Sequence, residues 1–242
     1  MMKKVLIFIL LSFGSVFAKE YMTKIEPFEK YEIKSQTSGV VELANKDLES
    51  QFIKMNKTLI QINSRDEEIE LQKQKNSLEI QEEIVKIKKR NFSAKNRISQ
   101  MSRYEKENEK LDFLESKKEL VLIEEEIKRL KNEISKKRFD VKNRYIYKIY
   151  VNKGEYITIG DLLYESYDIS KQKIKLYLTL GEIENLDKKS VFIDGKNSTF
   201  KVYKISKIKD EVRVSRYKVE FTKTNDNLKN YYFNKIVKVE LR

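Results

Sequence analysis

The chain has 242 residues, of which 37% are charged and 40% hydrophobic, and its formal net charge is +13. It contains no cysteine and no histidine, which excludes disulfides, soft metal sites, thiol nucleophiles and the most common general base. Only six glycines and one proline, with abundant Glu, Lys, Leu and Ile, indicate long helices.

The N-terminus has the pattern of a targeting segment. The basic "MMKK" precedes the apolar run "VLIFILLSFGSVF", and Val16-Phe17-Ala18 offers small residues before a cut. The apolar run of about 13 residues is short for a membrane span, which needs about 20. We predict a signal peptide over residues 1–18, cleaved after Ala18, and an exported protein. An uncleaved anchor is the alternative.

Two short phrases further along the chain share one pattern. "SQFIKMNKTLIQI" (residues 50–62) and "GEYITIGDLLYES" (residues 154–166) match at a constant offset of 104 positions. Each predicts two short strands joined near Asn56 or Gly160, where Asn or Gly can adopt positive φ. The alternating segments "YEIKSQTSGVVEL" and "RYIYKIYV", rich in Val, Ile and Tyr, lead into the two phrases and predict further strands.

The segment between the two phrases, residues 64–143, predicts helices. From Ser64 to Asn143 there is no Gly and no Pro, and apolar residues recur at the a and d spacing of a coiled coil. This stripe comprises Phe113, Leu120, Ile123, Ile127, Leu130, Ile134 and Val141, with Ile80, Ile84 and Ile87 upstream. The polar stretch "FSAKNRISQMS" has no clear register, so we place a turn there. The segment is then an antiparallel hairpin about 50 Å long, at about 1.5 Å per residue. One continuous dimeric coiled coil is the alternative.

The positions of these elements explain the repeated phrase. An antiparallel hairpin brings its ends together, so the strands at its two ends must meet. Neither set alone has enough strands to bury a core. One small β-domain is therefore written in two halves, with the hairpin inserted between them.

The C-terminal part predicts more strands. "KIKLYLTLGEIENL" reads as a strand followed by a short turn or helix, and "VFIDGKNSTFKVYKI" as a β-hairpin around Asp194-Gly195. "VRVSRYKVEF" and "KIVKVEL" are alternating strands. Residues 171–242 carry 18 Lys/Arg against 9 Asp/Glu, so much of the positive charge lies here.

In order and spacing, these features resemble the HlyD-type periplasmic adaptor, or membrane fusion, proteins. The marks are Gly39-Val40-Val41 and the two phrases, of which the second, with Gly154 and Gly160, is the closer match. The resemblance implies an α+β fold: a split lipoyl-like (barrel-sandwich hybrid) β-domain with an inserted antiparallel α-helical coiled-coil hairpin, followed by a small β-barrel. The corresponding limits are 19–63 plus 144–168 for the split domain, 64–143 for the hairpin and 169–242 for the barrel. Gly39, Gly154 and Gly160 are expected at structural turns.

The hairpin tip is the candidate site for a partner. Family members that meet a TolC-type channel often carry Arg-x3-Leu-x6-Ser there, and Lys88, Phe92 and Ser99 have this spacing with two substitutions. Residues 86–103 hold seven Lys/Arg, among them Arg90 and Arg97, and no acid. A basic tip favours an acidic partner surface, although solvated helix ends also explain such charges.

The resemblance implies an adaptor subunit, periplasmic and peripheral to the inner membrane, that bridges an inner-membrane transporter (ABC or RND type) and an outer-membrane TolC-like channel. Side-by-side packing into a ring of six is part of that expectation. We expect no catalytic residues, no metal, no cofactor and no nucleic-acid partner. The alternative function is a structural periplasmic coiled-coil scaffold, against which the split β-repeat argues.

Overall fold

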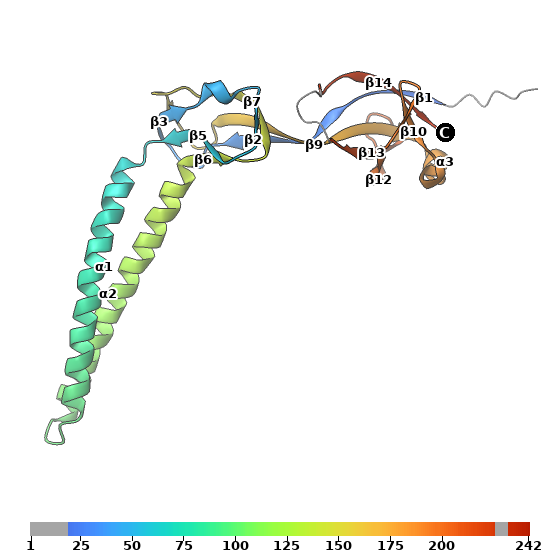
Figure 1. The fold of residues 1–242 in the computed structure, drawn as a ribbon. Coiled ribbons are helices and arrows are strands. Elements are labelled where there is room, and N and C mark those ends of the chain that lie inside the picture. Colours follow the sequence, from blue (N-terminus) through green and yellow to red (C-terminus); the bar gives the residue numbers. More distant parts are fainter. Residues whose placement is uncertain (1–18, 226–231) are drawn as a thin grey trace, which may run out of the picture. The chain divides into compact units, whose positions relative to one another are not determined.

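The computed structural model describes residues 19–225 and 232–242 (Figure 1). The predicted signal peptide lies outside the described residues. The chain forms two compact units, one of Lys30–Tyr167 and one that combines the chain up to Glu29 with Asp168–Arg242. Helices and sheets occupy separate stretches of the sequence, which confirms the α+β class. The finer domain limits given above remain predictions.

The unit Lys30–Tyr167 is built from strands on both sides of the helices. Its strands are β3 (Gly39–Ala44), β4 (Phe52–Ile53), β5 (Lys57–Ile62), β6 (Arg138–Val141), β7 (Arg144–Ile149) and β8 (Tyr156–Ile157), with parts of β2 (Glu26–Lys34) and β9 (Leu162–Leu178). β4 pairs antiparallel with β7, β5 with β6, and β3 with β8. Ile60 and Ile62 from one side share a buried core with Ile146 and Leu163 from the other. The two halves therefore fold as one body.

The repeated phrase forms the same local structure twice. β4 and β8 occupy corresponding positions, and the aligned Ile53 and Ile157 are both buried in the common core. At the turns, Gly154 and Gly160 have φ of 87° and 94°, and Ser50, aligned with Gly154, has φ of 58°. Asn56 is not among the described residues with positive φ, so the expectation for that turn is wrong. The first copy makes its bend without a left-handed residue at this position.

Gly39, at the start of β3, faces a different constraint. Its φ of 154° is accompanied by a close neighbour, because an added Cβ would lie 2.7 Å from Cγ2 of Ile62. Only glycine lets β3 approach β5 this closely without a shift of the Ile62 side chain.

The second unit contains strands from two sheets. Its elements are β1 (Glu20–Lys24), part of β9, α3 (Leu180–Ile183), β10 (Val191–Ile193), β11 (Lys196–Ser198), β12 (Lys201–Lys209), β13 (Tyr217–Thr224) and β14 (Ile236–Leu241). The strand orders are β1-β14-β10-β11 and β12-β13-β9. Asp194 and Gly195 both have positive φ and join β10 to β11, as the sequence predicts for a tight hairpin. Closure of this unit into a barrel remains a prediction.

One predicted strand begins later than its alternating pattern suggests. "VRVSRYKVEF" starts at Val212, but β13 starts at Tyr217. The Asp210 carboxylate accepts the Arg213 backbone N–H at 2.8 Å, and the Asp210 N–H donates to the Arg216 carbonyl at 2.9 Å. These bonds close a loop over residues 210–216. Local hydrogen bonding by an aspartate has overridden the period-two pattern.

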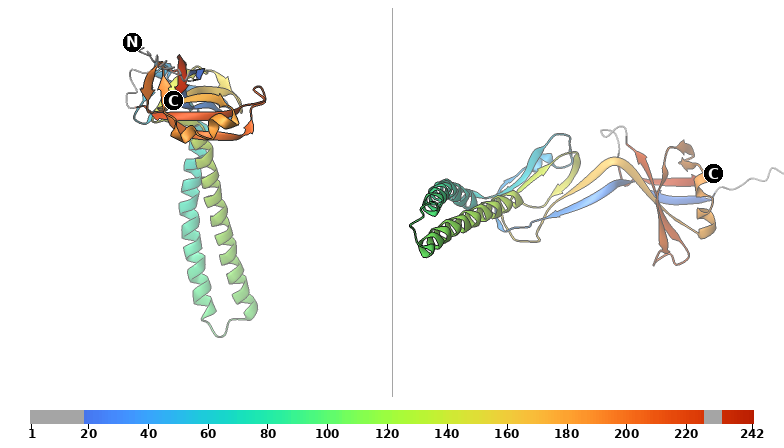
Figure 2. Two further views of the ribbon diagram at one scale, coloured as in Figure 1. Left: turned by 90° about the vertical axis from the view of Figure 1, so that its right-hand side faces the viewer. Right: turned by 90° about the horizontal axis from the view of Figure 1, so that it is seen from below.

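Two long helices lie side by side between β5 and β6 (Figures 1 and 2). α1 (Arg65–Asn96) and α2 (Arg103–Lys136) are joined by residues 97–102, within the stretch where the sequence predicts a turn. α2 begins with a capping box, in which Ser102 and Glu105 satisfy each other's backbone N–H groups. Among the described residues, no helix is long and apolar enough to cross a membrane.

The helical stripe ends sooner than the heptad pattern predicts. Val141 continues the seven-residue repeat of α2, yet it lies in β6, opposite Lys57 of β5, and is buried in the β core. After Lys136 the chain pairs with β5 as a strand, so Val141 is buried by β pairing rather than by helix packing. Periodicity alone does not distinguish these outcomes at an element boundary.

Gly160→Ala is expected to lower the free energy of unfolding by about 1 kcal/mol. The space around Gly160 is open, so the cost arises from its left-handed φ rather than from a clash. Urea denaturation measures the change. The matched control is Gly181→Ala in α3, where φ is not left-handed and stability should be unchanged or slightly higher. Equal urea denaturation midpoints for the two variants would contradict the left-handed conformation of Gly160.

Candidate interaction surfaces of the helix pair

The face of α2 that meets α1 is the predicted apolar stripe. Ile127 and Leu130 are buried, and Phe113, Leu120, Ile123 and Ile134 are half-buried. All six lie at the a and d spacing given by the sequence. The prediction for this helix surface is therefore confirmed as far as Ile134.

The matching face of α1 alternates apolar and polar residues. Leu71, Leu78, Val85 and Phe92 recur every seven residues, and so do Gln74, Gln81, Lys88 and Lys95; all eight are buried or half-buried. Gln81 shows how a polar group is accommodated here. Its Nε2 donates to the Ser116 carbonyl at 2.9 Å and to Glu119 at 3.1 Å, both on α2. A buried amide with partners of this kind costs little and fixes the register of the two helices.

The predicted stripe on α1 is on a different face. Ile80, Ile84 and Ile87 are 64%, 36% and 46% exposed, so they do not pack against α2. Their spacing is helical, but the face contacting α2 is about 120° away around the helix, at about 100° per residue. The sequence prediction for α1 is wrong. Its consequence is a row of exposed isoleucines, to which Ile69 also belongs.

The aromatic residue at the tip points inward. Phe92 of α1 stacks on Phe113 of α2, with ring centroids 6.1 Å apart and planes within 8°. Lys88, one turn earlier on the same face, is half-buried. Four-residue spacing places both side chains on one face of α1, and this face lies toward α2, so neither side chain is fully exposed to solvent. Ser99, Arg90 and Arg97 are exposed.

The charge at the tip is only partly neutralised. Ion pairs join Lys86 to Glu83, Lys95 to Glu109, and Arg103 to Glu107. Among the described residues, no carboxylate pairs with the tip cations Lys88, Lys89, Arg90 and Arg97. The last turn of α1 also carries the negative end of the helix dipole, which suits cations. The tip therefore presents unpaired positive charge, and Arg90 and Arg97 are the exposed cations among the predicted residues.

Neither a protein-family model nor a curated protein matches the chain. Solved structures do. The membrane fusion protein Spr0693 from Streptococcus pneumoniae R6 is similar with a TM-score of 0.68 and 7% identity, covering 93% of this chain and 99% of that one. This chain has the fold of the membrane fusion proteins.

Two further structures support the same fold. A MacA–MexA chimera that contains the Pseudomonas aeruginosa MexA α-hairpin domain gives a TM-score of 0.65 at 14% identity, over 93% of this chain and 81% of the other. MacA from Actinobacillus actinomycetemcomitans gives 0.58 at 16% identity, over 93% and 79%. At these identities, the likeness concerns the fold. The resemblance inferred from the sequence is thereby confirmed.

Phe92→Ala should loosen the tip of the helix pair. Loss of the stack on Phe113 removes apolar contact from a half-buried site, which we expect to cost about 1–2 kcal/mol. Hydrogen exchange of the amides around residues 92 and 113 measures the local effect. Phe92→Leu retains most of the apolar area and is the matched control. Unchanged exchange in Phe92→Ala would show that the stack contributes nothing.

Proposed function

We propose that this protein is the adaptor subunit of a tripartite efflux or secretion system, bridging an inner-membrane transporter and an outer-membrane TolC-type channel. The observation that carries the proposal is a membrane fusion protein fold whose inserted helix pair ends in unpaired cations. We propose a periplasmic location, with the signal peptide removed. The adaptor seals and couples, and the transporter supplies the energy.

The helix tip is the proposed contact with the channel. Arg90, Arg97 and Ser99 face solvent and would meet an acidic rim on the channel, where complementary charge speeds encounter and fixes register. The sequence predicts that Lys88 and Phe92 contact the partner directly, and we propose a different role for them. Because they face α2, they would shape the tip from within, and Lys88 would add positive charge at its edge.

Ring assembly is the second part of the proposal. The exposed isoleucines of α1, Ile69, Ile80, Ile84 and Ile87, form a row down one flank of the helix pair. α2 has exposed Leu111, Leu114, Val121 and Leu122 on the side away from α1. Apolar rows of this kind on a solvent-facing helix mark protein contacts. Contacts between the α1 row of one copy and the α2 row of the next are heterologous. Such contacts form a ring when the rotation between neighbouring copies closes, and we propose a closed ring of six copies.

Neutralising the tip tests channel docking. Arg90→Gln combined with Arg97→Gln should weaken crosslinking to the channel about three- to tenfold, as expected for two exposed charges. The defect should shrink as added salt screens the remaining charges. Lys128→Gln with Lys131→Gln, two exposed lysines on α2 away from the tip, is the matched control. Full transport activity and unchanged crosslinking in the tip variant would refute the tip as the docking site.

Charging the isoleucine row tests the ring. Ile84→Asp with Ile87→Asp should leave the monomer folded, because both side chains are exposed, and should shift sedimentation velocity from ring to monomer. Burying the new carboxylates against a neighbour would carry a large desolvation cost. Lys75→Gln with Ser93→Asp makes the same change in net charge on another face of α1 and should assemble normally. Rings formed by the Asp variant would rule out this lateral surface.

A further inference from the structure

The β12–β13 hairpin ends in an exposed group of aliphatic residues. Ile208, Val212 and Val214 are 81%, 87% and 74% exposed, and we call these three the apolar tip. They lie at the end of β12 and in the loop before β13, where Lys209 and Tyr217 form the last pair of the register. Single exposed aliphatic residues are ordinary on a protein surface, but three together at the end of a hairpin are not.

Hydrogen bonds and a side-chain contact hold the loop in a defined conformation. The exposure of the apolar tip is therefore a feature of an ordered loop. Besides the two bonds made by Asp210, the Arg216 N–H donates to the Arg213 carbonyl at 2.8 Å, and the Ser206 hydroxyl donates to the Ile208 carbonyl at 2.8 Å. The Arg213 guanidinium stacks 3.8 Å from the ring centroid of Tyr177 on β9. These contacts hold the backbone while leaving the aliphatic side chains in solvent.

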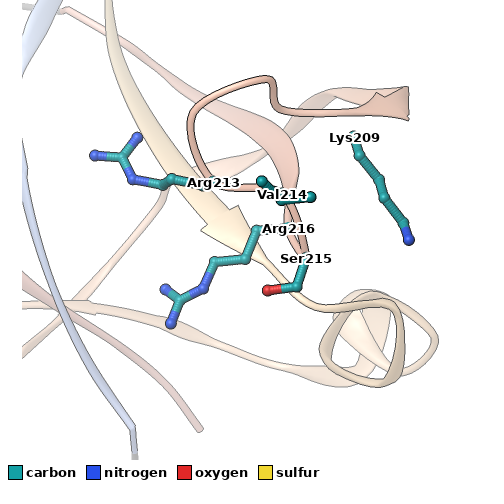
Figure 3. Close-up of a pocket in the computed structure, with 5 residues that line it drawn as sticks. All are labelled: Lys209, Arg213, Val214, Ser215 and Arg216. Atoms are coloured by element: carbon teal, nitrogen blue, oxygen red, sulfur yellow. The ribbon is translucent and has the colours of Figure 1, made fainter.

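Positive charge surrounds the apolar tip. Residues 201–218 carry seven Lys/Arg and two Asp/Glu. On β12, Lys201, Lys204, Lys207 and Lys209 are all exposed. In the close-up of the loop, Arg213 and Arg216 extend to one side and Lys209 lies on the other, with Val214 between them (Figure 3). Cations thus lie on both sides of Val214.

This combination has a specific physical meaning. Aliphatic side chains at the very end of a rigid hairpin can enter the acyl boundary of a bilayer, while flanking lysines and arginines meet anionic headgroups. A protein partner would instead favour aromatic anchors and a pocket-filling shape, and the apolar tip contains no aromatic residue. We propose that the β12–β13 hairpin binds an anionic phospholipid bilayer directly, with the apolar tip inserted and Lys207 and Lys209 at headgroup level.

This lipid contact belongs to the unit that contains β12 and β13 and is independent of any transporter or channel, so it adds to the proposed function. Vesicles contain neither protein, so a negative result there leaves the adaptor proposal untouched. Conversely, failure of channel docking leaves the lipid contact standing.

The absence of tryptophan from the chain allows a direct test. Val214→Trp places the only tryptophan of the chain in the apolar tip, in protein recovered from the exported fraction, and its emission is followed by selective excitation of tryptophan over tyrosine. Vesicles of phosphatidylcholine containing phosphatidylglycerol should shift its emission to the blue, and phosphatidylcholine alone should shift it much less. Raising the ionic strength from about 0.1 M to about 1 M shortens the screening length from about 10 Å to about 3 Å and should weaken binding strongly. Met55→Trp, at an exposed position in the other unit, should show no shift and is the matched control.

Two further variants separate insertion from attraction. Lys207→Gln with Lys209→Gln should reduce binding to the anionic vesicles about tenfold or more, since each cation near such a surface contributes about fivefold. Ile208→Asp with Val212→Asp should abolish the blue shift of the Val214→Trp background. Lys188→Gln with Lys196→Gln, exposed cations elsewhere in the same unit, should bind normally. The proposal is overturned if no vesicle is bound, if Val214→Trp shifts only on addition of a protein partner, or if these controls lose binding equally.

Discussion

The structure of the helix-bearing unit depends on one constraint: strands from before and after the helices must pair with each other. β5 and β6 are the strands that enter and leave the helix pair, and they are adjacent in the same sheet. At their ends, the Ile62 N–H donates to the Lys137 carbonyl at 2.8 Å, and Nζ of Lys137 donates to the Asn63 carbonyl at 2.9 Å. The bases of α1 and α2 are thus fixed side by side by β pairing, and the turn at the far end needs only to close a preformed pair.

Lys137 makes this junction specific. It is only 7% exposed, and its ammonium also pairs with Glu67 in the first turn of α1. Burial raises the pKa of Glu67, but the hydrogen bond and the charge of Lys137, together with a backbone hydrogen bond at Glu67, outweigh burial and hold the pKa below its usual value. Removing either partner of such a pair leaves a poorly solvated charge, so the contact defines the register of the two helix bases more than it adds stability.

The sequence predicts one helix face of the pair well and the other badly, for a physical reason. On α2, the residues that meet α1 are apolar, so periodicity and burial coincide. On α1, Gln81, Lys88 and Lys95 occupy the contacting face, where Gln81 forms hydrogen bonds and Lys95 an ion pair with α2. The isoleucines lie elsewhere. A pattern that ranks residues by hydrophobicity selects the largest apolar row, and on α1 that row is left to solvent in the single chain.

In the β units, the sequence predicts elements that have a local signal and misses features that do not follow from one. The repeat at an offset of 104 positions predicts β4 and β8, because alternation and turn residues are local signals. The pairing of β1 with β14, from opposite ends of the chain, has no local signal of any kind. The Asp210 loop is missed for another reason: one hydrogen-bonding side chain decides between strand and turn, against the alternating pattern. Of the candidate tip residues, the sequence gives the cluster of cations but not the direction in which Phe92 points.

The two cationic surfaces of the chain differ in what accompanies the charge, and that difference governs what each can bind. At the helix tip, the phenyl ring of Phe92 is turned toward Phe113, so the accessible predicted residues are charged or polar. Charge alone raises the rate of encounter and selects a partner, and it is sensitive to salt. On β12–β13, exposed aliphatic side chains accompany the cations, so apolar burial adds to a charge attraction that salt still screens. The helix tip, where charge acts alone, suits a contact that forms and separates repeatedly. A contact that must persist at a surface of constant chemistry suits the β12–β13 hairpin, since apolar burial slows release while the surrounding lysines confine it to anionic surfaces.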